Sequence, residues 1–596
     1  MLSFINRCKD CSPKETIEKA RSIISNLNLM TSEQWFTPVS GLYSLQLSLI
    51  GTSIRSNGKG STPEFALASA YGELLERIQN LVYFRISHYS DCYTFNTPFR
   101  VSKDEIITDN VCELPAQEKF FRMVIKDDWF ECIHAWDCVY KNRSVVSTRF
   151  KNLMDPSDEL LVPELPFCFY YGSNGMAGGN TYSEAFVQAL SEVFERYAVK
   201  RIINDKLTPP DITEYIVKKY PEIRKIIEDI QMQSIDITIR IKDISLGLGL
   251  PVFAAVYIDK SKSEYFVNFG CHPNIIVAIE RSLTELYQGQ THVKVNNATS
   301  INQMIVDKAQ TITSIFSTGE GAYPIQFFGK NESYKKLDIE KFSFENNSEM
   351  FHYFMDIINS MGLKLYYQDA GFLGFPTVSV IIPGISEIAV DTSDTTAIIE
   401  AGHYMNFLGN YKSIDLLSDT ELISLAQFLE DCPHRPSTSI NEVLRVPIDL
   451  YHNPHFDDIT IDLFLSMIYI RLKKYEKAKK HLDNFIKYMR SCEADDYSIQ
   501  YNLIISSILR CRIENMKDSD IINSLSDFFP VDDIKSCIKD TQHQKIFAGL
   551  PRCNCPHCDL CEYNQICHFS KDNEVLNELI KIKNTYDALE DVIHLF

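Results

Sequence analysis

The sequence predicts a mixed α/β (α+β) fold followed by an all-α module, and three observations support this expectation. The chain has 596 residues, which is more than one hydrophobic core usually organises. Strand-like runs such as Val252–Ile258 and Val378–Ile382 alternate with helical stretches in the first two thirds. Farther on, helix-period segments such as Asp462–Leu472 and Tyr475–Met489 dominate. We therefore expect an α/β body over residues 1–410, a helical module over 415–540 and a Cys-rich tail over 541–596.

The composition excludes several classes of protein. Hydrophobic residues make up 45% and charged residues 23%, which is typical of a globular protein. The formal charge of -20 disfavours loose binding to long nucleic acids. The first fifteen residues carry charges where a signal peptide would be apolar, and no run approaches the roughly 20 apolar residues that span a bilayer. We expect a cytoplasmic protein with neither nucleic acid nor membrane as a partner. The 17 cysteines then indicate reduced thiols and a metal site rather than disulfides.

One pattern of glutamates occurs twice. Ser56-Asn57-Gly58 precedes a helical segment with Glu73, Glu76 and Arg77, and Ser173-Asn174-Gly175 precedes one with Glu192, Glu195 and Arg196. At about 100° per residue, each Glu pair lies at nearly the same angle to the apolar stripe of its helix and points away from it. The two stripes are Leu67, Tyr71, Leu74, Leu75 and Ile78, and Phe186, Leu190, Val193, Phe194 and Tyr197.

A single Glu-x-x-Glu-Arg is most often a solvated helix face, but its repetition favours a shared site. Four carboxylates brought together raise one another's pKa unless cations neutralise them, so the pattern indicates a metal. Hard oxygen ligands favour Mg²⁺ or Ca²⁺, and Mg²⁺ is usually shared with the phosphates of a substrate. Arg196 and a third helical segment, Ala278–Leu286 with Arg281 and Glu285, offer partners for phosphate.

The stretch Gly58–Thr62 (Gly-Lys-Gly-Ser-Thr) is not interpreted as a phosphate-binding P-loop. The leading Gly-x-x-x-x is missing, an extra Gly separates Lys59 from Ser61, and we expect no clear strand running directly into a helix here. Magnesium held by several glutamates is the preferred interpretation.

At these residues the chain resembles the YcaO family. The matching segments are SNGKG with GELLER, SNGMAGGNT with SEAFVQALSEVFER, and AIERSLTELYQG, and they occur in the family's order and spacing. CKDCSPKETI, FGCHP and VIIPGISEI extend the resemblance to the stand-alone enterobacterial members, which carry a helical, tetratricopeptide-like C-terminal region. The resemblance implies a YcaO-type ATP-binding domain over roughly residues 1–410.

By position, the resemblance also implies the roles of individual residues. Arg281 and Glu285 are assigned to catalysis, and Arg196 and Arg281 to the phosphates. Lys9 and Thr16 would touch the nucleotide, with Glu184 near the nucleoside; Thr16 stands where Ser is more typical. The magnesium ligands would be Glu73, Glu76, Glu192, Glu195 and Glu285.

Family members phosphorylate a backbone amide oxygen, so the resemblance implies an ATP- and magnesium-dependent enzyme that activates the amide of a peptide or protein. Azoline-forming members commonly end in a proline-rich tail, which this sequence lacks at its end, EDVIHLF. This difference counts against azoline formation. The resemblance to the stand-alone members instead implies an accessory factor for β-methylthiolation of a small-subunit ribosomal protein, with a radical methylthiotransferase or a sulfur donor as partner. The alternatives are a thioamide- or azoline-forming enzyme of a peptide natural product and a non-catalytic adaptor with a vestigial nucleotide site. The family also implies a homodimer.

The rest of the chain carries two weaker patterns. Tyr475–Ile486 matches the second helix of a tetratricopeptide repeat, although an irregular helical bundle fits as well. Near the end, Cys553, Cys555, Cys558, Cys561 and Cys567 lie within fifteen residues. The spacing from Cys555 onward suits an iron–sulfur cluster better than zinc, with His557 or His568 as alternate ligands. Cys8 and Cys11 form another Cys-x-x-Cys pair, either a redox or sulfur-handling pair beside the nucleotide or simply two small residues, and the second interpretation is preferred.

Overall fold

The chain forms two compact units in the computed structural model. The first contains Met1–Arg85, Arg100–Thr395 and Asp572–Phe596, and the second contains Ile86–Phe99 and Thr396–Lys571. The structure describes residues 9–39, 42–82, 102–140, 144–232, 236–285, 298–319, 321–389, 391–399, 414, 417–431, 436–438, 440, 459–492, 494–542, 546–547, 565 and 568–586. None of the helices in these ranges is both long and apolar enough to cross a membrane.

The first unit contains three sheets whose strands all pair antiparallel. One has the order β1-β2-β3, another β11-β10-β9-β8, and the third β4-β5-β12-β13-β7 with β6 beside β5. The strands are β1 Thr31–Val39, β2 Leu42–Leu49, β3 Arg55–Gly60, β4 Glu105–Thr108, β5 Val145–Asn152, β6 Glu159–Pro163, β7 Met176–Gly178, β8 Ile237–Asp243, β9 Val252–Asp259, β10 Glu264–Cys271, β11 Thr299–Ser300, β12 Tyr366–Asp369 and β13 Thr377–Ile381. The predicted mixed α/β body is therefore confirmed, with β9 and β13 at the two quoted strand-like runs.

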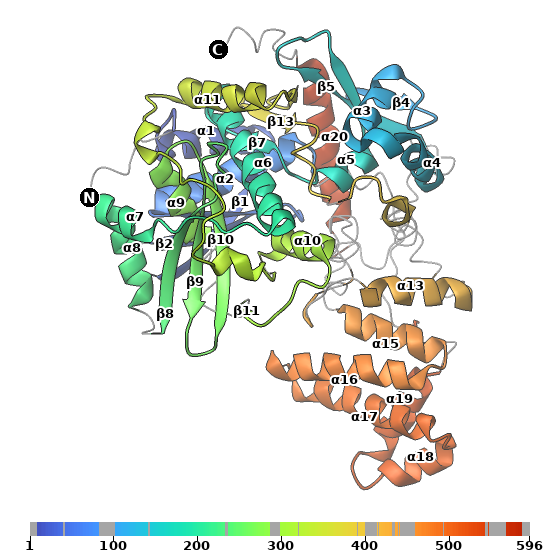
Figure 1. The fold of residues 1–596 in the computed structure, drawn as a ribbon. Coiled ribbons are helices and arrows are strands. Elements are labelled where there is room, and N and C mark those ends of the chain that lie inside the picture. Colours follow the sequence, from blue (N-terminus) through green and yellow to red (C-terminus); the bar gives the residue numbers. More distant parts are fainter. Residues whose placement is uncertain are drawn as a thin grey trace. The chain divides into compact units, whose positions relative to one another are not determined.

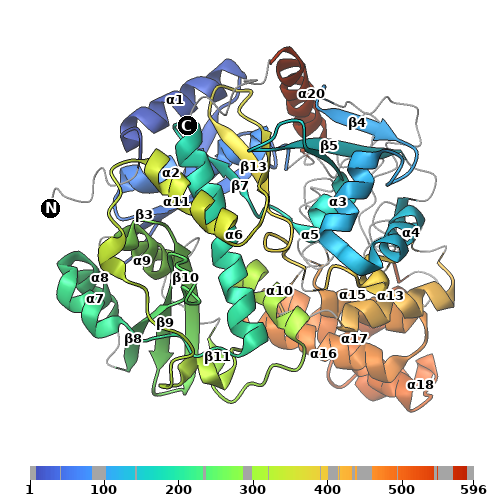
Figure 2. The same ribbon diagram turned by 45° about the horizontal axis from the view of Figure 1, so that its top comes forward.

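Helices pack between and around these sheets. They are α1 Pro13–Asn26, α2 Pro63–Gln79, α3 Pro115–Ile125, α4 Trp129–Tyr140, α5 Glu164–Tyr170, α6 Tyr182–Asp205, α7 Thr213–Lys219, α8 Pro221–Gln231, α9 Ile275–Thr284, α10 Lys308–Thr318, α11 Asn347–Ser360 and α20 Phe569–Thr585. Figures 1 and 2 both place α6 in the middle of the first unit, with α10 and α11 beside it. Side chains on most sides of α6 are buried, which is the property of a helix enclosed by a core.

The described part of the second unit is helical, as predicted. Its main helices are α13 Asp419–Asp431, α15 Ile461–Arg471, α16 Tyr475–Ser491, α17 Asp496–Ile513, α18 Asp518–Leu525 and α19 Val531–Asp540. Their apolar faces form one continuous core. The comparison of Tyr475–Ile486 with a tetratricopeptide helix stays a prediction.

The last helix, α20, belongs to the first unit, so the segment expected as one Cys-rich tail is divided at Asp572. Val575, Leu576, Leu579 and Ile580 join the core that α1, α2 and β2 share. Such packing depends on contacts with residues some 500 positions earlier in the chain, which sequence periodicity does not show.

Several polar contacts also hold α20 in the first unit. Lys583 Nζ lies 3.0 Å from Asp104 Oδ1, and Ser53 Oγ donates to Asp572 Oδ2 at 2.7 Å. Lys583 is only 5% exposed, so its ammonium is satisfied mainly within the protein. Burial of Asp104 alone would raise its pKa, but Lys583, Ser102 and Gln368 hold the carboxyl near about 2.

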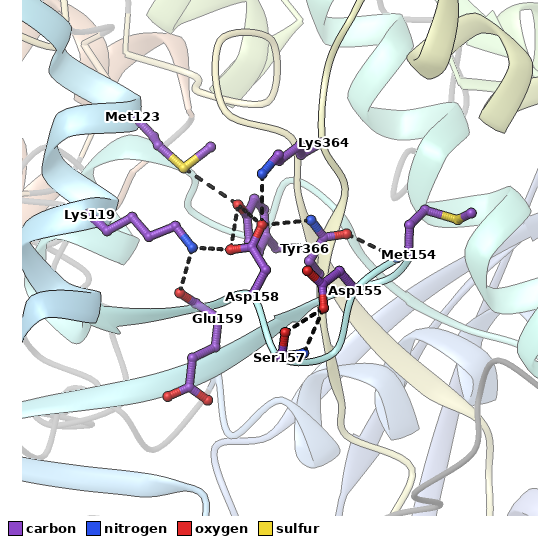
Figure 3. Close-up of polar contacts among 10 residues, drawn as sticks. Lys119, Met123, Met154, Asp155, Ser157, Asp158, Glu159, Lys364 and Tyr366 are labelled. Carbon is purple, nitrogen blue, oxygen red and sulfur yellow. Dashed lines mark hydrogen bonds and ion pairs between the residues drawn. The ribbon is translucent and has the colours of Figure 1, made fainter.

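Asp158 links three separate parts of the first unit (Figure 3). Its carboxylate accepts from Lys119 of α3, from Lys364 at 2.8 Å and from Asn152 of β5 at 2.9 Å. The hydroxyl of Tyr366, on β12, lies 3.2 Å from both carboxylate oxygens. Burial alone would raise the pKa of Asp158, but these donors outweigh it and hold the pKa well below the usual range.

We predict that Asp158→Asn lowers the free energy of unfolding of the first unit by about 2 kcal/mol at pH 7, because the two lysines lose a shared charged acceptor. A carboxyl with a depressed pKa stabilises the fold above its unfolded value of 3.8, so the difference from wild type should shrink as pH falls below about 4. Chemical denaturation followed by tryptophan fluorescence measures this, because Trp35, Trp129 and Trp136 all lie in the first unit.

The matched control is Asp155→Asn in the same turn. Asp155 is exposed and accepts from Ser157 of its own turn, so its replacement should change the unfolding free energy by less than about 0.5 kcal/mol. Equal effects of the two variants would contradict the role given to Asp158.

Candidate functional site

The helices α2, α6 and α9, which carry the predicted glutamates and arginines, each begin just after a strand. A glycine in that strand, or directly after it, faces the helix. At Gly58 of β3, a Cβ atom would lie 2.1 Å from the Ala66 oxygen of α2, and at Gly270 of β10 it would lie 2.1 Å from the Ala278 oxygen of α9. Gly179, just after β7, similarly faces α6 with 2.7 Å to the Ala185 nitrogen. Each helix therefore packs directly on its preceding strand, at a separation that no other residue type permits.

A side-chain cap marks the start of each of these helices. Thr62 accepts from the Phe65 N–H, and Thr181 accepts from the Glu184 N–H at 3.1 Å. Asn274 accepts from the Ile276 N–H at 3.1 Å and from the following amide. Capping oxygens satisfy amides that have no partner within the helix, so these residues set where α2, α6 and α9 begin.

One ground given for excluding a P-loop is wrong, because β3 leads into α2 after only two residues. The sequence of β3 has little apolar alternation, and its strand conformation depends on pairing with β2 and on the glycine contacts with α2. The exclusion itself rests on the missing leading glycine and on Lys59, which points from this strand to Glu285.

The predicted apolar stripes of α2 and α6 are buried, which leaves the glutamates on the remaining face. The aromatic and aliphatic side chains of both stripes are at most 9% exposed, apart from the partly buried Leu67. The side chain of Glu76 is 14% exposed and that of Glu192 is 25% exposed. The glutamates thus lie at the edge of the core rather than on an open helix surface.

The two glutamate pairs act on one another electrostatically. Burial raises the pKa of Glu76 to about 8, with Glu192 and Glu73 raising it further and Arg77 opposing them. Burial also raises the pKa values of Glu73 and Glu195, and Glu192 contributes to both shifts. The charge of Glu192 on α6 therefore acts on both glutamates of α2, although the two segments lie about 120 residues apart.

Cations lie among these carboxylates. Arg77 Nε is 3.5 Å from Glu76 Oε1, and Arg196 Nη2 is 2.7 Å from Glu192 Oε1. Lys59 forms an ion pair with Glu285 at the end of α9. Burial lowers the pKa of Lys59 to about 7, and Arg281 lowers it further, whereas Glu195 and Glu73 oppose the shift.

Arg281 extends from α9 toward the same cluster. Its guanidinium donates to the Cys271 carbonyl at 3.2 Å, and its charge acts on Lys59 and Glu195. Sequence reasoning assigned no role to Lys59, although its segment was quoted both for the rejected P-loop and for the family resemblance.

The donor chemistry of the cluster fits magnesium, but the side chains are not gathered around one point. Within the described ranges, no group of three or more His, Cys, Asp or Glu side chains is arranged to hold a metal ion. Arg77 and Arg196 contact three of the four glutamates of α2 and α6. Carboxylate oxygens are nevertheless the ligands that Mg²⁺ prefers, and burial raises the pKa values of three of these glutamates.

A second group of predicted residues meets at the start of α6. Lys9 Nζ lies 2.8 Å from Glu184 Oε1, and the Asp10 N–H donates to Glu184 Oε2 at 3.0 Å. Thr16 Oγ1 donates to Asn180 Oδ1 at 2.9 Å, and the Asn180 amide contacts Glu184. Lys9, Thr16 and Glu184 are thus brought together around the first turn of α6.

A cavity of about 410 Å³ adjoins this group. Lys9 and Asp10 line one part of it, Asn274 at the start of α9 lines another, and the aromatic residues Tyr220 and Phe342 contribute rings. Its volume is that of a small-molecule site. The cavity and the glutamate cluster both border α9, through Asn274 at its start and Arg281 two turns later.

The cysteine predictions fall mostly outside the described residues. Cys553, Cys555, Cys558, Cys561 and Cys567 lie there, as do His557 and Cys8. Cys11 is half-buried, and burial raises the pKa of its thiol. Metal binding by the C-terminal cysteines stays a prediction.

Comparison with known proteins identifies the family of the chain. Residues 57–386, more than half of the chain, match the family described as YcaO cyclodehydratase, ATP- and Mg²⁺-binding. The chain therefore belongs to the YcaO family.

Curated relatives share part of the chain. It is 28% identical over 416 residues to the ribosomal protein S12 methylthiotransferase accessory factor YcaO of Escherichia coli (strain K12). The aligned region covers 64% of this chain and 66% of that protein. An uncharacterized protein of Haemophilus influenzae is 28% identical over 404 residues, with the same two shares. The chain thus matches just under two thirds of the length of these relatives.

Solved structures of related proteins are more distant. The structure of YcaO from Methanopyrus kandleri bound with AMPPCP and Mg²⁺ gives a TM-score of 0.41 at 17% identity, covering 64% of this chain and 93% of that one. A heterocyclase in complex with substrate and cofactor gives a TM-score of 0.44 at 17% identity, covering 63% and 53%.

We predict that Glu76→Gln stabilises the ligand-free first unit, by about 1–2 kcal/mol at pH 8. A carboxyl whose folded pKa is raised to about 8 keeps its proton longer than in the unfolded chain, where the value is 4.5. Stability therefore falls as pH rises from 4.5 to 8, and the neutral amide removes this loss. The advantage of the variant should be small at pH 5 and largest at pH 8, measured by denaturation with tryptophan fluorescence.

Glu64→Gln is the control, because Glu64 is exposed in the first turn of the same helix. It should leave stability unchanged or slightly lower it, through the loss of a favourable charge at the helix N-terminus. A Glu76→Gln variant that is less stable than wild type at pH 8 would mean that Glu76 serves the fold rather than a ligand.

Proposed function

We propose that the protein binds ATP with magnesium and uses it to activate an amide of a peptide or protein substrate. The observation that carries the proposal is the meeting of four carboxylates from α2 and α6 beside Arg196, Arg281 and Lys59. Such a site offers oxygen ligands to Mg²⁺ and charged donors to phosphate. The proposed magnesium ligands are Glu73, Glu76, Glu192, Glu195 and Glu285.

In this proposal the nucleoside occupies the cavity beside the start of α6. Lys9, Thr16 and Glu184 would contact it, and the rings of Tyr220 and Phe342 offer apolar surface to a base. The phosphates would extend along α9 toward Arg281. This placement of the phosphates is supported because the start of α9 borders the cavity and a later turn of α9 borders the glutamates.

The chemical work of the chain is then charge neutralisation and positioning. Phosphoryl transfer to an amide oxygen spreads negative charge over oxygens that preorganised cations stabilise. Arg196 and Arg281 supply such charge, and we assign Arg281 and Glu285 to catalysis. Glu285 is paired with Lys59, so magnesium at Glu285 would share this carboxylate with Lys59 or replace it.

For the substrate, we propose a small-subunit ribosomal protein, with the chain acting as an accessory factor in its β-methylthiolation. The supporting observation is the similarity to the Escherichia coli accessory factor, which extends over 64% of this chain. A radical methylthiotransferase or a sulfur donor would be the partner, in the cytoplasm. The proposal includes a homodimer, a tetratricopeptide-like role for the second unit and an iron–sulfur cluster or zinc at Cys555, Cys558, Cys561 and Cys567.

The nucleotide proposal predicts that Glu195→Gln weakens magnesium-dependent ATP binding at least 30-fold and abolishes ATP hydrolysis. Glu195 lies between the charges of Arg281, Glu192 and Arg196, where a neutral amide cannot ligate Mg²⁺ comparably. Calorimetry with ATP, with and without Mg²⁺, measures binding, and phosphate release measures hydrolysis.

Glu118→Gln is the control, since Glu118 forms an exposed pair with Arg122 on α3. It should bind and hydrolyse ATP like wild type. The proposal is wrong if the wild-type protein binds no ATP with Mg²⁺, or if Glu195→Gln binds it as wild type does.

The substrate proposal predicts a mass difference in one small-subunit ribosomal protein between cells with and without the gene. Methylthiolation replaces hydrogen by a methylthio group, which adds about 46 Da by its elemental composition. Intact-mass spectrometry of purified ribosomes checks this. An unchanged set of ribosomal proteins, together with a modified short peptide encoded nearby, would instead support a thioamide- or azoline-forming enzyme.

A further inference from the structure

His272 lies in the chain between Cys271, whose carbonyl accepts from Arg281, and Asn274, which lines the cavity, and none of the predicted site roles uses it. It follows the last residue of β10 and precedes the Asn274 cap of α9 by two positions. The residue is 6% exposed, so its imidazole is enclosed by the protein. A polar ring enclosed in this way needs hydrogen-bond partners on both nitrogens, which come from the protein or from a ligand.

The backbone defines the tautomer of this ring. The Asn274 N–H donates to His272 Nδ1 at 3.0 Å, so Nδ1 is an acceptor and carries no proton. The remaining proton of the neutral ring is therefore on Nε2, which becomes a hydrogen-bond donor. Burial and the charges of Arg281 and Lys9 also lower the pKa of His272 well below its usual range, which agrees with a neutral ring.

The neighbours of the ring indicate what the Nε2 donor would bind. Lys9 lines the cavity and Arg281 extends toward the glutamates, and both act electrostatically on His272. Arg281 also donates to the carbonyl of Cys271, the residue directly before His272. A neutral N–H donor flanked by two cations suits an anionic oxygen. Its hydrogen bond is directional and adds no charge.

A role in the turn before α9 explains the Nδ1 atom of the imidazole but not the proton on Nε2. Acceptance of the N–H two residues later is the contact that Asn or Asp side chains make when they stabilise turns. A shorter residue would therefore serve the turn before α9 equally well. The imidazole additionally presents a donor on the far side of the ring.

We propose that His272 is a nucleotide-binding residue whose neutral Nε2–H donates a hydrogen bond to a phosphate oxygen of the bound nucleotide, between Lys9 and Arg281. The inference rests on the proposed nucleotide site and adds to it a residue that recognises the phosphate through one directional hydrogen bond. It concerns phosphate rather than base, because both flanking groups are cations.

Two substitutions separate the donor from the turn. His272→Asn keeps an acceptor near Nδ1 for the Asn274 N–H and removes the distal donor, whereas His272→Gln places an amide N–H near Nε2. We expect His272→Asn to weaken binding of ATP with Mg²⁺ about 10-fold and His272→Gln to stay within about 3-fold of wild type, since one charge-assisted hydrogen bond is lost only in the first. Adenosine, which has no phosphate, should bind both variants as it binds wild type.

Calorimetry on the full chain measures these affinities, and tryptophan fluorescence during thermal unfolding verifies that both variants fold. The inference is wrong if Asn and Gln weaken ATP binding equally, if His272→Asn binds ATP like wild type, or if adenosine loses as much affinity as ATP. Its failure is distinct from failure of the proposed function, because in the latter case the wild-type protein itself would bind no ATP with Mg²⁺.

Discussion

Burial of the glutamates of α2 and α6, with Glu192 adding repulsion, is the constraint on which the first unit depends most. Glu73, Glu76 and Glu195 all have raised pKa values, and Glu192 contributes to each shift. Such a cluster costs stability in the absence of a ligand, and the surrounding arginines offset only part of the cost. A fold that keeps an unfavourable charge arrangement in its centre is suited to binding cations, because a bound cation offsets the cost of the buried carboxylates.

The cluster exists because three helices are held unusually close to their strands. Gly58 and Gly270 bring α2 and α9 into direct contact with β3 and β10, and the caps Thr181 and Asn274 set the starts of α6 and α9. These residues touch neither carboxylate pair. They nevertheless determine where the glutamates of each helix lie relative to those of the other helices. A cation shared among the helices requires these positions to match.

The chain returns to the first unit after forming the second. Most of the second unit, Thr396–Lys571, precedes α20, which then completes the core around α1 and α2. Tyr586, just after α20, donates to Asp369 Oδ2 at 3.2 Å, and Tyr182, the first residue of α6, donates to Asp369 Oδ1 at 2.7 Å. The end of the chain therefore helps to fix the start of the helix that carries Glu184 and the second glutamate pair.

The sequence by itself determined the faces of the helices, because the 3.6-residue period decides which side chains share one side. It placed Glu76 and Glu195 opposite buried stripes, and it identified the mixed body and the helical module. Only the tertiary structure decided that the charges on these faces act on one another, that Lys59 pairs with Glu285, and that the charge of Lys9 acts on His272. Those contacts join segments from about 120 to over 250 residues apart, and chain periodicity carries no information about such distances. Local repetition therefore predicted the residues of the site, whereas long-range packing decided their charge environment.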